Sequence, residues 1–221
     1  MLVSVESAAE RLGLNPARVR ALVAGGQLAG HKIGGRWVID DAAIAARLDR
    51  PTRPGRPLSA RSAWGLLWTA AGEPTPWLAP RERARARERM RDWPIEDWPW
   101  ATQHRAAARR LRAHPSVLDA VRDDPRSVRS GGSVRHLPID LVAVGDAEIY
   151  LRSSDVERFI ADYALLDSNQ PNITIRVPPE DLWLFETNDA PWPVVVVDLL
   201  ESGDDRSARS ARQLNKRMRS R

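Results

Sequence analysis

Apolar residues in the first fifty positions recur with the period of an α-helix. From Val5 to Leu12 they stand at i, i+3, i+4 and i+7, the spacing of a helix with one apolar face. Ser4 precedes this helix as an N-cap residue, and Gly13 follows it at a position that favours a left-handed turn. The pattern predicts a short amphipathic helix that ends in a tight turn.

The next segment has the start and stop signals of a second helix. Asn15 offers an N-cap oxygen, Pro16 suits the first helical position, and a glycine pair at 25–26 ends the helix. Its inward residues are Val19, Leu22 and Val23. Small and basic residues occupy its outer face, namely Ala17, Arg18, Arg20 and Ala21. Alanine permits close approach to DNA, and a guanidinium group can reach a phosphate or the major-groove edge of guanine.

A hairpin is predicted after the second helix. Two short strands between residues 28 and 39 flank Gly34-Gly35, a turn that permits positive φ. This hairpin is a wing that carries Lys32 and Arg36 beside its tip. An aspartate at 40 or 41 then caps a third helix, whose inward residues are Ala43, Ile44 and Leu48.

The segment from Ser4 to Arg20, followed by Gly26-Gln27-Leu28, resembles the excisionase and MerR-like winged helix-turn-helix family over about residues 3–48. In that family the second helix enters the major groove, and the wing touches the DNA backbone or the minor groove. The resemblance implies double-stranded DNA as the partner. The candidate DNA-binding residues are Asn15, Ala17, Arg18, Arg20, Lys32 and Arg36. A protein-binding winged helix is the alternative, because alanines at 17, 21 and 24 leave the recognition surface sparse.

Proline content marks the first domain boundary. Prolines at 51, 54 and 57 stop both a helix and a central strand. Helical patterns resume over residues 59–72, 80–92 and 101–113, and β-rich runs follow a glycine pair at 131–132. The predicted fold class is α+β. The predicted domains are a winged helix-turn-helix (1–49), a proline-rich linker (50–58), a helical segment (59–114) and an acidic α+β domain with a basic C-terminal helix (115–221).

Charge is distributed unevenly along the chain. The net charge is +5 overall, +2 for residues 1–50, +8 for 51–135 and −5 for 136–221, with −12 for 136–205 alone. Arginine fills every odd position from 81 to 91, so a helix there carries two guanidinium stripes and little apolar surface. Such a helix can track phosphates, can be a solvated bridge, or can face the acidic domain. The sequence leaves these alternatives open.

The chain has nine tryptophans, three of them within residues 93–100. Aromatic residues among arginines can stack on single-stranded nucleic acid. Trp-Pro pairs and the i, i+4 spacing of Trp64 and Trp68 favour core packing instead. We interpret these rings, and Trp37 of the wing, as core residues.

The C-terminal part combines short β-rich runs with helical patterns. Strands are predicted over 139–144, 147–151, 173–177 and the all-valine run 194–197, and helices over 154–165 and 207–217. This module is similar to the C-terminal domains of AbiEi-type antitoxins of type IV toxin–antitoxin systems, over about residues 105–215. The resemblance rests on Val128-Arg129-Ser130-Gly131 and on the closing Asp198-Leu199-Leu200 and Asp205-Arg206. The resemblance implies an autorepressor that binds its own promoter and opposes a nucleotidyltransferase-like toxin protein.

One motif echoes an enzyme signature. In nucleotidyltransferases a Gly-Ser turn precedes two carboxylates on one strand that bind the catalytic metal. Gly132-Ser133 and Asp140 fit, but Pro138 replaces the first carboxylate, so a metal-dependent nucleic-acid enzyme that uses Asp140 is the least favoured hypothesis. The chain has no cysteine and only four scattered histidines, which argues against thiolate chemistry and a structural zinc site. We expect no cofactor, no metal and no enzymatic activity.

The leading hypothesis is a sequence-specific DNA-binding transcriptional regulator, the antitoxin and autorepressor of an AbiEi-like system. The alternative is an excisionase-like architectural or recombination-directing factor of a mobile element. No apolar stretch approaches the roughly 20 residues of a membrane span, and the N-terminus lacks signal-peptide features, so a cytoplasmic location without membrane contact is expected. A homodimer is compatible with palindromic DNA, although no heptad pattern specifies one.

Overall fold

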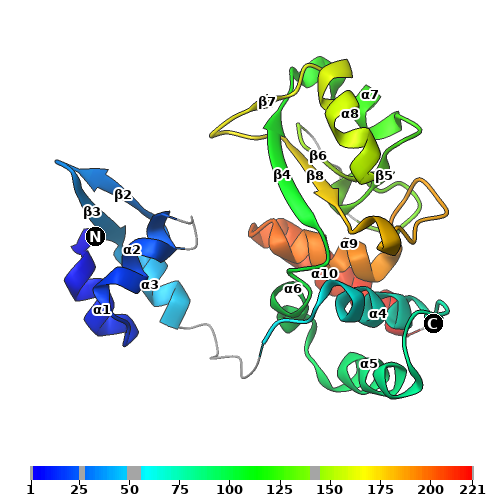
Figure 1. The fold of residues 1–221 in the computed structure, drawn as a ribbon, viewed down its shortest axis with the longest axis horizontal. Coiled ribbons are helices and arrows are strands. Elements are labelled where there is room, and N and C mark those ends of the chain that lie inside the picture. The colour runs from blue at the N-terminus through cyan, green and yellow to red at the C-terminus, as the bar shows by residue number, and fades with distance from the viewer. Residues whose placement is uncertain (1, 25–27, 49–55, 140–144, 221) are drawn as a thin grey trace. The chain divides into compact units, whose positions relative to one another are not determined.

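The computed structural model describes residues 2–24, 28–48, 56–139 and 145–220. The chain divides into two compact units, Met1–Gly55 and Arg56–Arg221 (Figure 1). Three predicted features fall wholly or partly outside the described residues: the glycine pair at 25–26, linker residues 50–55, and strand residues 140–144 with Asp140. Each unit has its own core.

The N-terminal unit combines three helices with a small sheet. Its helices are α1 (Val5–Leu12), α2 (Pro16–Ala24) and α3 (Asp41–Leu48), and its strands are β1 (Leu2–Ser4), β2 (Gly30–Ile33) and β3 (Arg36–Asp40). β3 lies between β1 and β2 and pairs antiparallel with both. These elements confirm the predicted winged helix-turn-helix. β1 was not predicted, because a strand of three residues is too short to show a periodic pattern.

Local signals set the ends of the first two helices. The Ser4 hydroxyl accepts a hydrogen bond from the Ser7 amide over 3.2 Å, and Asn15 Oδ1 accepts one from the Arg18 amide over 2.7 Å. Both helices therefore begin at their predicted caps. Gly13 ends α1 with φ of 62°, a left-handed conformation that a Cβ disfavours. The helices then bury their apolar faces with the sheet in one core that includes Val19, Leu22, Ile39 and Ile44.

The second unit is built on a mixed sheet. Its strands in the described residues are β4 (Ala107–Arg112), β5 (Val128–Arg129), β6 (Ala147–Tyr150), β7 (Leu166–Asp167) and β8 (Ile173–Val177), in the order β5-β6-β8-β4-β7. β6 and β8 are parallel, and the other pairs are antiparallel. Its α-helices are α4 (Ala60–Ala71), α5 (Pro80–Asp92), α6 (Trp98–Ala101), α7 (Leu118–Asp123), α8 (Val156–Asp162), α9 (Trp192–Glu201) and α10 (Asp205–Arg219). The predicted α+β class is confirmed.

The two faces of this sheet differ in chemistry because successive strand residues point to opposite sides. Ile149 and Ile175 belong to an apolar core shared with α7 and α8. Their neighbours Tyr150 and Arg176 contact Asp198 of α9 on the other side. One face of the sheet is therefore apolar, and the other carries polar and charged side chains.

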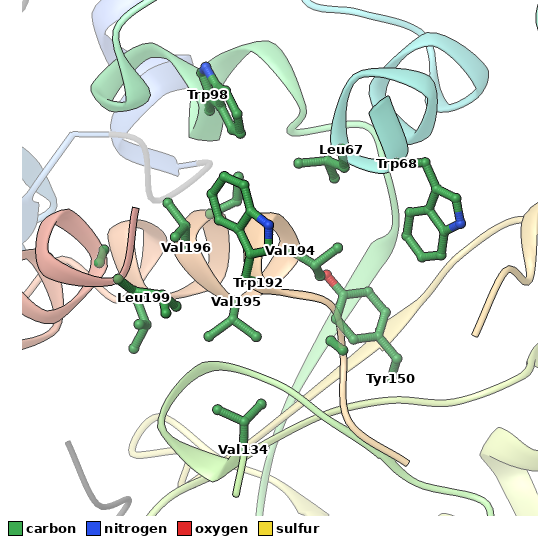
Figure 2. Packing of buried hydrophobic residues seen from close by; sticks show 14 of the residues in the cluster. Leu67, Trp68, Trp98, Val134, Tyr150, Trp192, Val194, Val195, Val196 and Leu199 are labelled. Atoms are coloured by element: carbon green, nitrogen blue, oxygen red, sulfur yellow. The ribbon is translucent and has the colours of Figure 1, made fainter. Parts of the chain in front are cut away.

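The second unit has another apolar core besides the one shared with α7 and α8, and helix α9 lies at its centre (Figure 2). The four valines at 194–197 are all buried, among side chains such as Leu67 of α4 and Trp98 of α6. The strand predicted over 194–197 is wrong, because these residues belong to a helix that begins with Trp192 and Pro193. A helix that is apolar on every side shows no helical period, so its valine run cannot be distinguished from a buried strand.

The helix predicted over 101–113 is also wrong. α6 ends at Ala101, and β4 pairs antiparallel with β8 from Ala107 to Leu111. Alanine and arginine favour a helix when each residue is considered alone, but pairing with a distant strand overrides that preference. Other predicted elements agree with the structure, namely those of α4, α5, α8, α10, β6 and β8. Because β4 joins the helical segment to the sheet, residues 56–221 form one unit.

The packing interpretation is confirmed for Trp64, Trp68 and Trp98, which are all buried. The ring centroids of Trp64 and Trp68 are 5.3 Å apart with an interplanar angle of 78°, an edge-to-face contact. Trp64 Nε1 donates a hydrogen bond to the Arg105 carbonyl over 2.8 Å. These rings therefore stabilise the fold, and stacking on nucleic acid would require exposed faces that they lack.

The arginine-rich helix α5 contacts α4 and has one buried residue, Ala86. In the described residues its ion pairs lie within α5 or join it to α4, such as that of Glu82 with Arg61 of α4 over 3.4 Å. Among the residues that the structure describes, its arginines at 81, 85 and 87 have no carboxylate partner. The arrangement does not support pairing of these arginines with the acidic segment at 136–205. Phosphate tracking by α5 stays a hypothesis.

A buried ion network joins α9 to the charged face of the sheet. Arg105 and Asp198 have no exposed surface, and Arg176 is 8% exposed. Arg105 contacts Asp198, and its Nη1 lies 2.7 Å from Glu201 Oε1. Arg176 Nη2 lies 2.6 Å from Glu148 Oε1, and its Nη1 lies 2.8 Å from Glu201 Oε2. Removing a charge from water is costly unless it is paired, so each member of this network depends on the others.

The Ser-Gly-Gly-Ser turn at 130–133 contacts the same network. Its first serine donates a hydrogen bond to Asp198, and its last serine accepts one from the Glu148 amide over 3.1 Å. Gly131 has φ of 54°, and a Cβ at this position would lie 2.3 Å from Glu148 Oε2. The turn therefore requires glycine to approach the network, which accounts structurally for the motif.

Substitution of Arg105 by Met should lower the free energy of unfolding by about 3–5 kcal/mol, because Asp198 would lose a buried partner. The matched control is Arg61→Met, which removes an exposed pair and should cost less than about 1 kcal/mol. Urea unfolding of both variants measures the difference. Equal losses would show that the network does not stabilise the second unit.

The stability of the second unit should depend on pH through Glu148. Burial raises the pKa of Glu148 from its ordinary 4.5 to about 7, and the neighbouring Asp198 adds to the rise. The folded state holds the proton more tightly than the unfolded state, so this contribution to stability is complete below about pH 4.5 and is lost as the pH rises towards about 7. Unfolding at several pH values should show a steeper decline for the natural chain than for Glu148→Gln. Parallel pH profiles would contradict the assignment.

Candidate nucleic-acid interface

The outer face of α2 is the candidate reading surface. Val19 and Leu22 are buried in the core of the N-terminal unit, which fixes the opposite side of the helix towards solvent. The outward residues Ala17, Arg18, Arg20 and Ala21 are all exposed. The helix therefore presents small and basic side chains while its apolar side is covered.

The two arginines lie on opposite flanks of this face. They are two positions apart, which corresponds to about 200° around a helix axis. Ala17 and Ala21 are four positions apart and occupy the middle of the exposed face. In a groove, such a helix would bring methyl groups towards the base edges and one guanidinium group towards each backbone. The geometry suits phosphate contacts at both edges of the helix.

Asn15 has a structural role at the start of α2. Its Oδ1 accepts a hydrogen bond from the Arg18 amide over 2.7 Å, and its backbone carbonyl accepts one from the Val19 amide over 3.2 Å. The side chain is exposed, but the carboxamide oxygen is engaged as a cap. Asn15 therefore orients the helix, and its contribution to DNA binding would be mainly indirect.

Arg20 already forms an ion pair with a carboxylate of the same unit. Its Nη2 lies 3.7 Å from Glu6 Oε1 of α1, and both side chains are more than half exposed. Exposed ion pairs at this distance contribute little to stability. A phosphate could displace Glu6, so the pair keeps Arg20 near the surface of α1 without removing it from the candidate interface.

The wing places its two basic residues on different faces. Lys32 pairs across the hairpin with Trp37, and its Nζ lies 5.0 Å from the centre of the Trp37 ring. Arg36 precedes Trp37 in β3, so strand alternation directs it to the opposite face. Both side chains are exposed, and Trp37 packs partly against the core. A wing of this kind can meet phosphates on both sides when its tip enters a groove.

Sequence reasoning missed contacts that support this surface. Arg11 of α1 forms an ion pair with Asp41 at the start of α3, and β1 adds a third strand beside β3. Both depend on pairing between residues about thirty or more positions apart, for which a single sequence gives no direct signal. The six candidate residues are all at the surface of this unit, and their contact with DNA stays a prediction.

Comparison with known families gives an independent result for the N-terminal unit. Residues 2–51 match the model of the family described as "Helix-turn-helix domain". No curated protein and no solved structure matches the chain. None of the helices in the described ranges is long and apolar enough to cross a membrane. The family match and the arrangement of α1, α2 and the wing agree, and the N-terminal unit is a helix-turn-helix domain of the kind that supports DNA binding.

Proposed function

We propose that this protein is a sequence-specific DNA-binding transcriptional regulator, in which α2 enters the major groove and the wing contacts the flanking backbone. One observation carries this proposal: α2 exposes an Ala and Arg face while Val19 and Leu22 seal its other side in the core. The major groove is about 12 Å wide and admits a helix. Small residues at 17 and 21 allow the helix axis to approach the base edges.

The proposed interface divides its tasks among few side chains. Arg18 and Arg20 supply charge at the two flanks of α2, and Lys32 and Arg36 supply it at the wing. Because alanine cannot form hydrogen bonds with bases, direct readout would depend on guanine contacts by the arginines and on methyl contacts by the alanines. DNA shape would contribute the remaining specificity.

We further propose that the second unit makes this regulator an autorepressing antitoxin without enzymatic activity. The support is the resemblance of residues 105–215 to AbiEi-type antitoxins, together with a separate core that can carry a second task. Its partner would be a nucleotidyltransferase-like toxin protein. Two copies of the chain on a palindromic operator would form a homodimer on DNA.

The DNA-binding proposal is tested with the segment upstream of the gene for this chain. Arg18→Ala should weaken binding about tenfold and reduce the salt dependence of affinity by about one unit, because one phosphate contact is lost. Fluorescence anisotropy over a series of salt concentrations measures both effects. Arg85→Ala removes the same charge from α5 and is the matched control. Unchanged affinity for Arg18→Ala, or an equal loss for Arg85→Ala, would contradict the assignment of α2.

The antitoxin proposal is tested by co-expression. A nucleotidyltransferase encoded beside this chain should arrest growth alone, and the full chain should restore growth. Arg18→Ala should still restore growth, because the proposed toxin contact belongs to the second unit. No rescue by the natural chain, or a neighbouring integrase whose attachment DNA this chain binds, would instead favour the excisionase-like role.

A further inference from the structure

The charged face of the sheet borders a cavity that the DNA-binding proposal does not use. The cavity has a volume of about 510 Å³ and lies between the sheet and the turn from α9 to α10. Its wall includes Glu148, Arg176 and Glu201 of the buried ion network. The network therefore meets a space that a small molecule can enter.

The charges of the network do not balance. Two guanidinium groups face three carboxylates, those of Arg105 and Arg176 against Glu148, Asp198 and Glu201. The cavity wall adds two arginines and two aspartates, at 110, 206, 146 and 204, which cancel each other. One negative charge remains when every carboxyl group is ionised. An uncompensated charge away from water is costly, so the site favours uptake of a proton or of a cation.

Glu148 has an acceptor atom that the network leaves open. Its Oε1 accepts hydrogen bonds from Arg176 Nε over 2.8 Å and contacts Arg176 Nη2 over 2.6 Å. In the part of the chain that the structure describes, no donor reaches Glu148 Oε2. This oxygen lies beside Gly131, where the absence of a Cβ leaves room for it. The Glu148 side chain is 18% exposed on the cavity wall.

A proton and a cation would compete for this carboxylate. Burial raises the pKa of Glu148 to about 7, Asp198 of α9 adds to the rise, and Arg176 of β8 and Arg105 oppose it. The other groups of the network near it are Glu201 of α9 and the Tyr150 hydroxyl on its own strand. Near neutral pH the carboxyl group is therefore partly protonated, and a bound cation would displace the proton.

The donor set suits an organic cation. The described residues include no group of three or more His, Asp or Glu side chains arranged to hold a metal ion. Glu201 is already shared between Arg105 and Arg176. A guanidinium or ammonium group needs only directed N–H contacts to an open oxygen such as Glu148 Oε2. We propose that this cavity binds a small molecule with a guanidinium group, held by Glu148 on the wall of the cavity.

The cavity wall also suits a second, anionic group on the same molecule. Arg110 of β4 and Arg206 of α10 are exposed, and they have no carboxylate partner in the described ranges. A molecule with a cation at one end and a carboxylate at the other would match both parts of the site. L-arginine has this arrangement and is a suitable probe. L-citrulline has nearly the same shape, but its side chain is neutral.

The test is calorimetric titration of the full chain with each probe. L-arginine should bind saturably, and L-citrulline should bind at least about tenfold more weakly. The affinity for L-arginine should rise as the pH increases from about 6 to about 8, because Glu148 loses its proton. Titrations in buffers with different ionisation enthalpies should show release of a proton on binding.

Variants separate the site from general effects of charge. Glu148→Gln removes the charge with little change in shape and should abolish the preference for L-arginine over L-citrulline. Asp146→Asn removes one negative charge from the exposed edge of the cavity and leaves the network intact, so it should weaken L-arginine binding severalfold. This variant keeps the proposal testable if Glu148→Gln fails to fold. Glu88→Gln, on the exposed side of α5, is the matched control and should bind as the natural chain does.

Three results would overturn the proposal: no saturable binding of L-arginine, equal binding of the two probes, or binding unaffected by both Glu148→Gln and Asp146→Asn. Competition by Mg²⁺ alone at equal ionic strength would also overturn it, because the site would then hold a metal ion. None of these measurements uses DNA, so their outcome is independent of the regulatory function.

Discussion

The apolar contact between α2 and the core of its unit is the constraint on which the proposed function depends. α2 has nine residues, too few to be stable as an isolated helix in water. Val19 and Leu22 hold it against residues such as Ile39 and Ile44. This contact determines which residues remain outside, so the exposure of Ala17, Arg18, Arg20 and Ala21 is a consequence of packing. A reading surface results without a large number of polar side chains.

The second unit is organised by a different principle, the burial of charge. Strand alternation gives the sheet an apolar face towards α7 and α8 and a charged face towards α9. The valines of α9 fill the core, while its Asp198 and Glu201 tie the helix to Arg105 and Arg176. The same arrangement leaves one negative charge beside a cavity. Stability and a candidate binding site therefore arise from one set of side chains.

The sequence predicts structure well where the signals are local. Caps at Ser4 and Asn15, the helical period of α1 and the glycine turn of the wing each act within a few residues, and the family match supports the resulting helix-turn-helix. The prediction for α9 is wrong because a helix that is apolar on every side shows no helical period. The prediction for β4 is wrong because its strand conformation depends on pairing with the distant β8.

The ion network could not be assembled from the sequence, since Arg105 contacts Asp198 and Glu201 from 93 and 96 positions away. The sequence nevertheless contains a partial signal for this network. Glu148 and Arg176 are single charged residues within short apolar strands, which indicates that each needs a buried partner, although not which one.

The most direct test of the central claim is to map DNA contacts on the full chain by NMR. Amide resonances would be followed during titration with the upstream duplex. The account predicts that the largest shifts fall on residues 15–23, which cover the cap and most of α2, and on 31–37 of the wing, with small changes in α5. Shifts concentrated on the arginines of α5, with α2 unaffected, would contradict it.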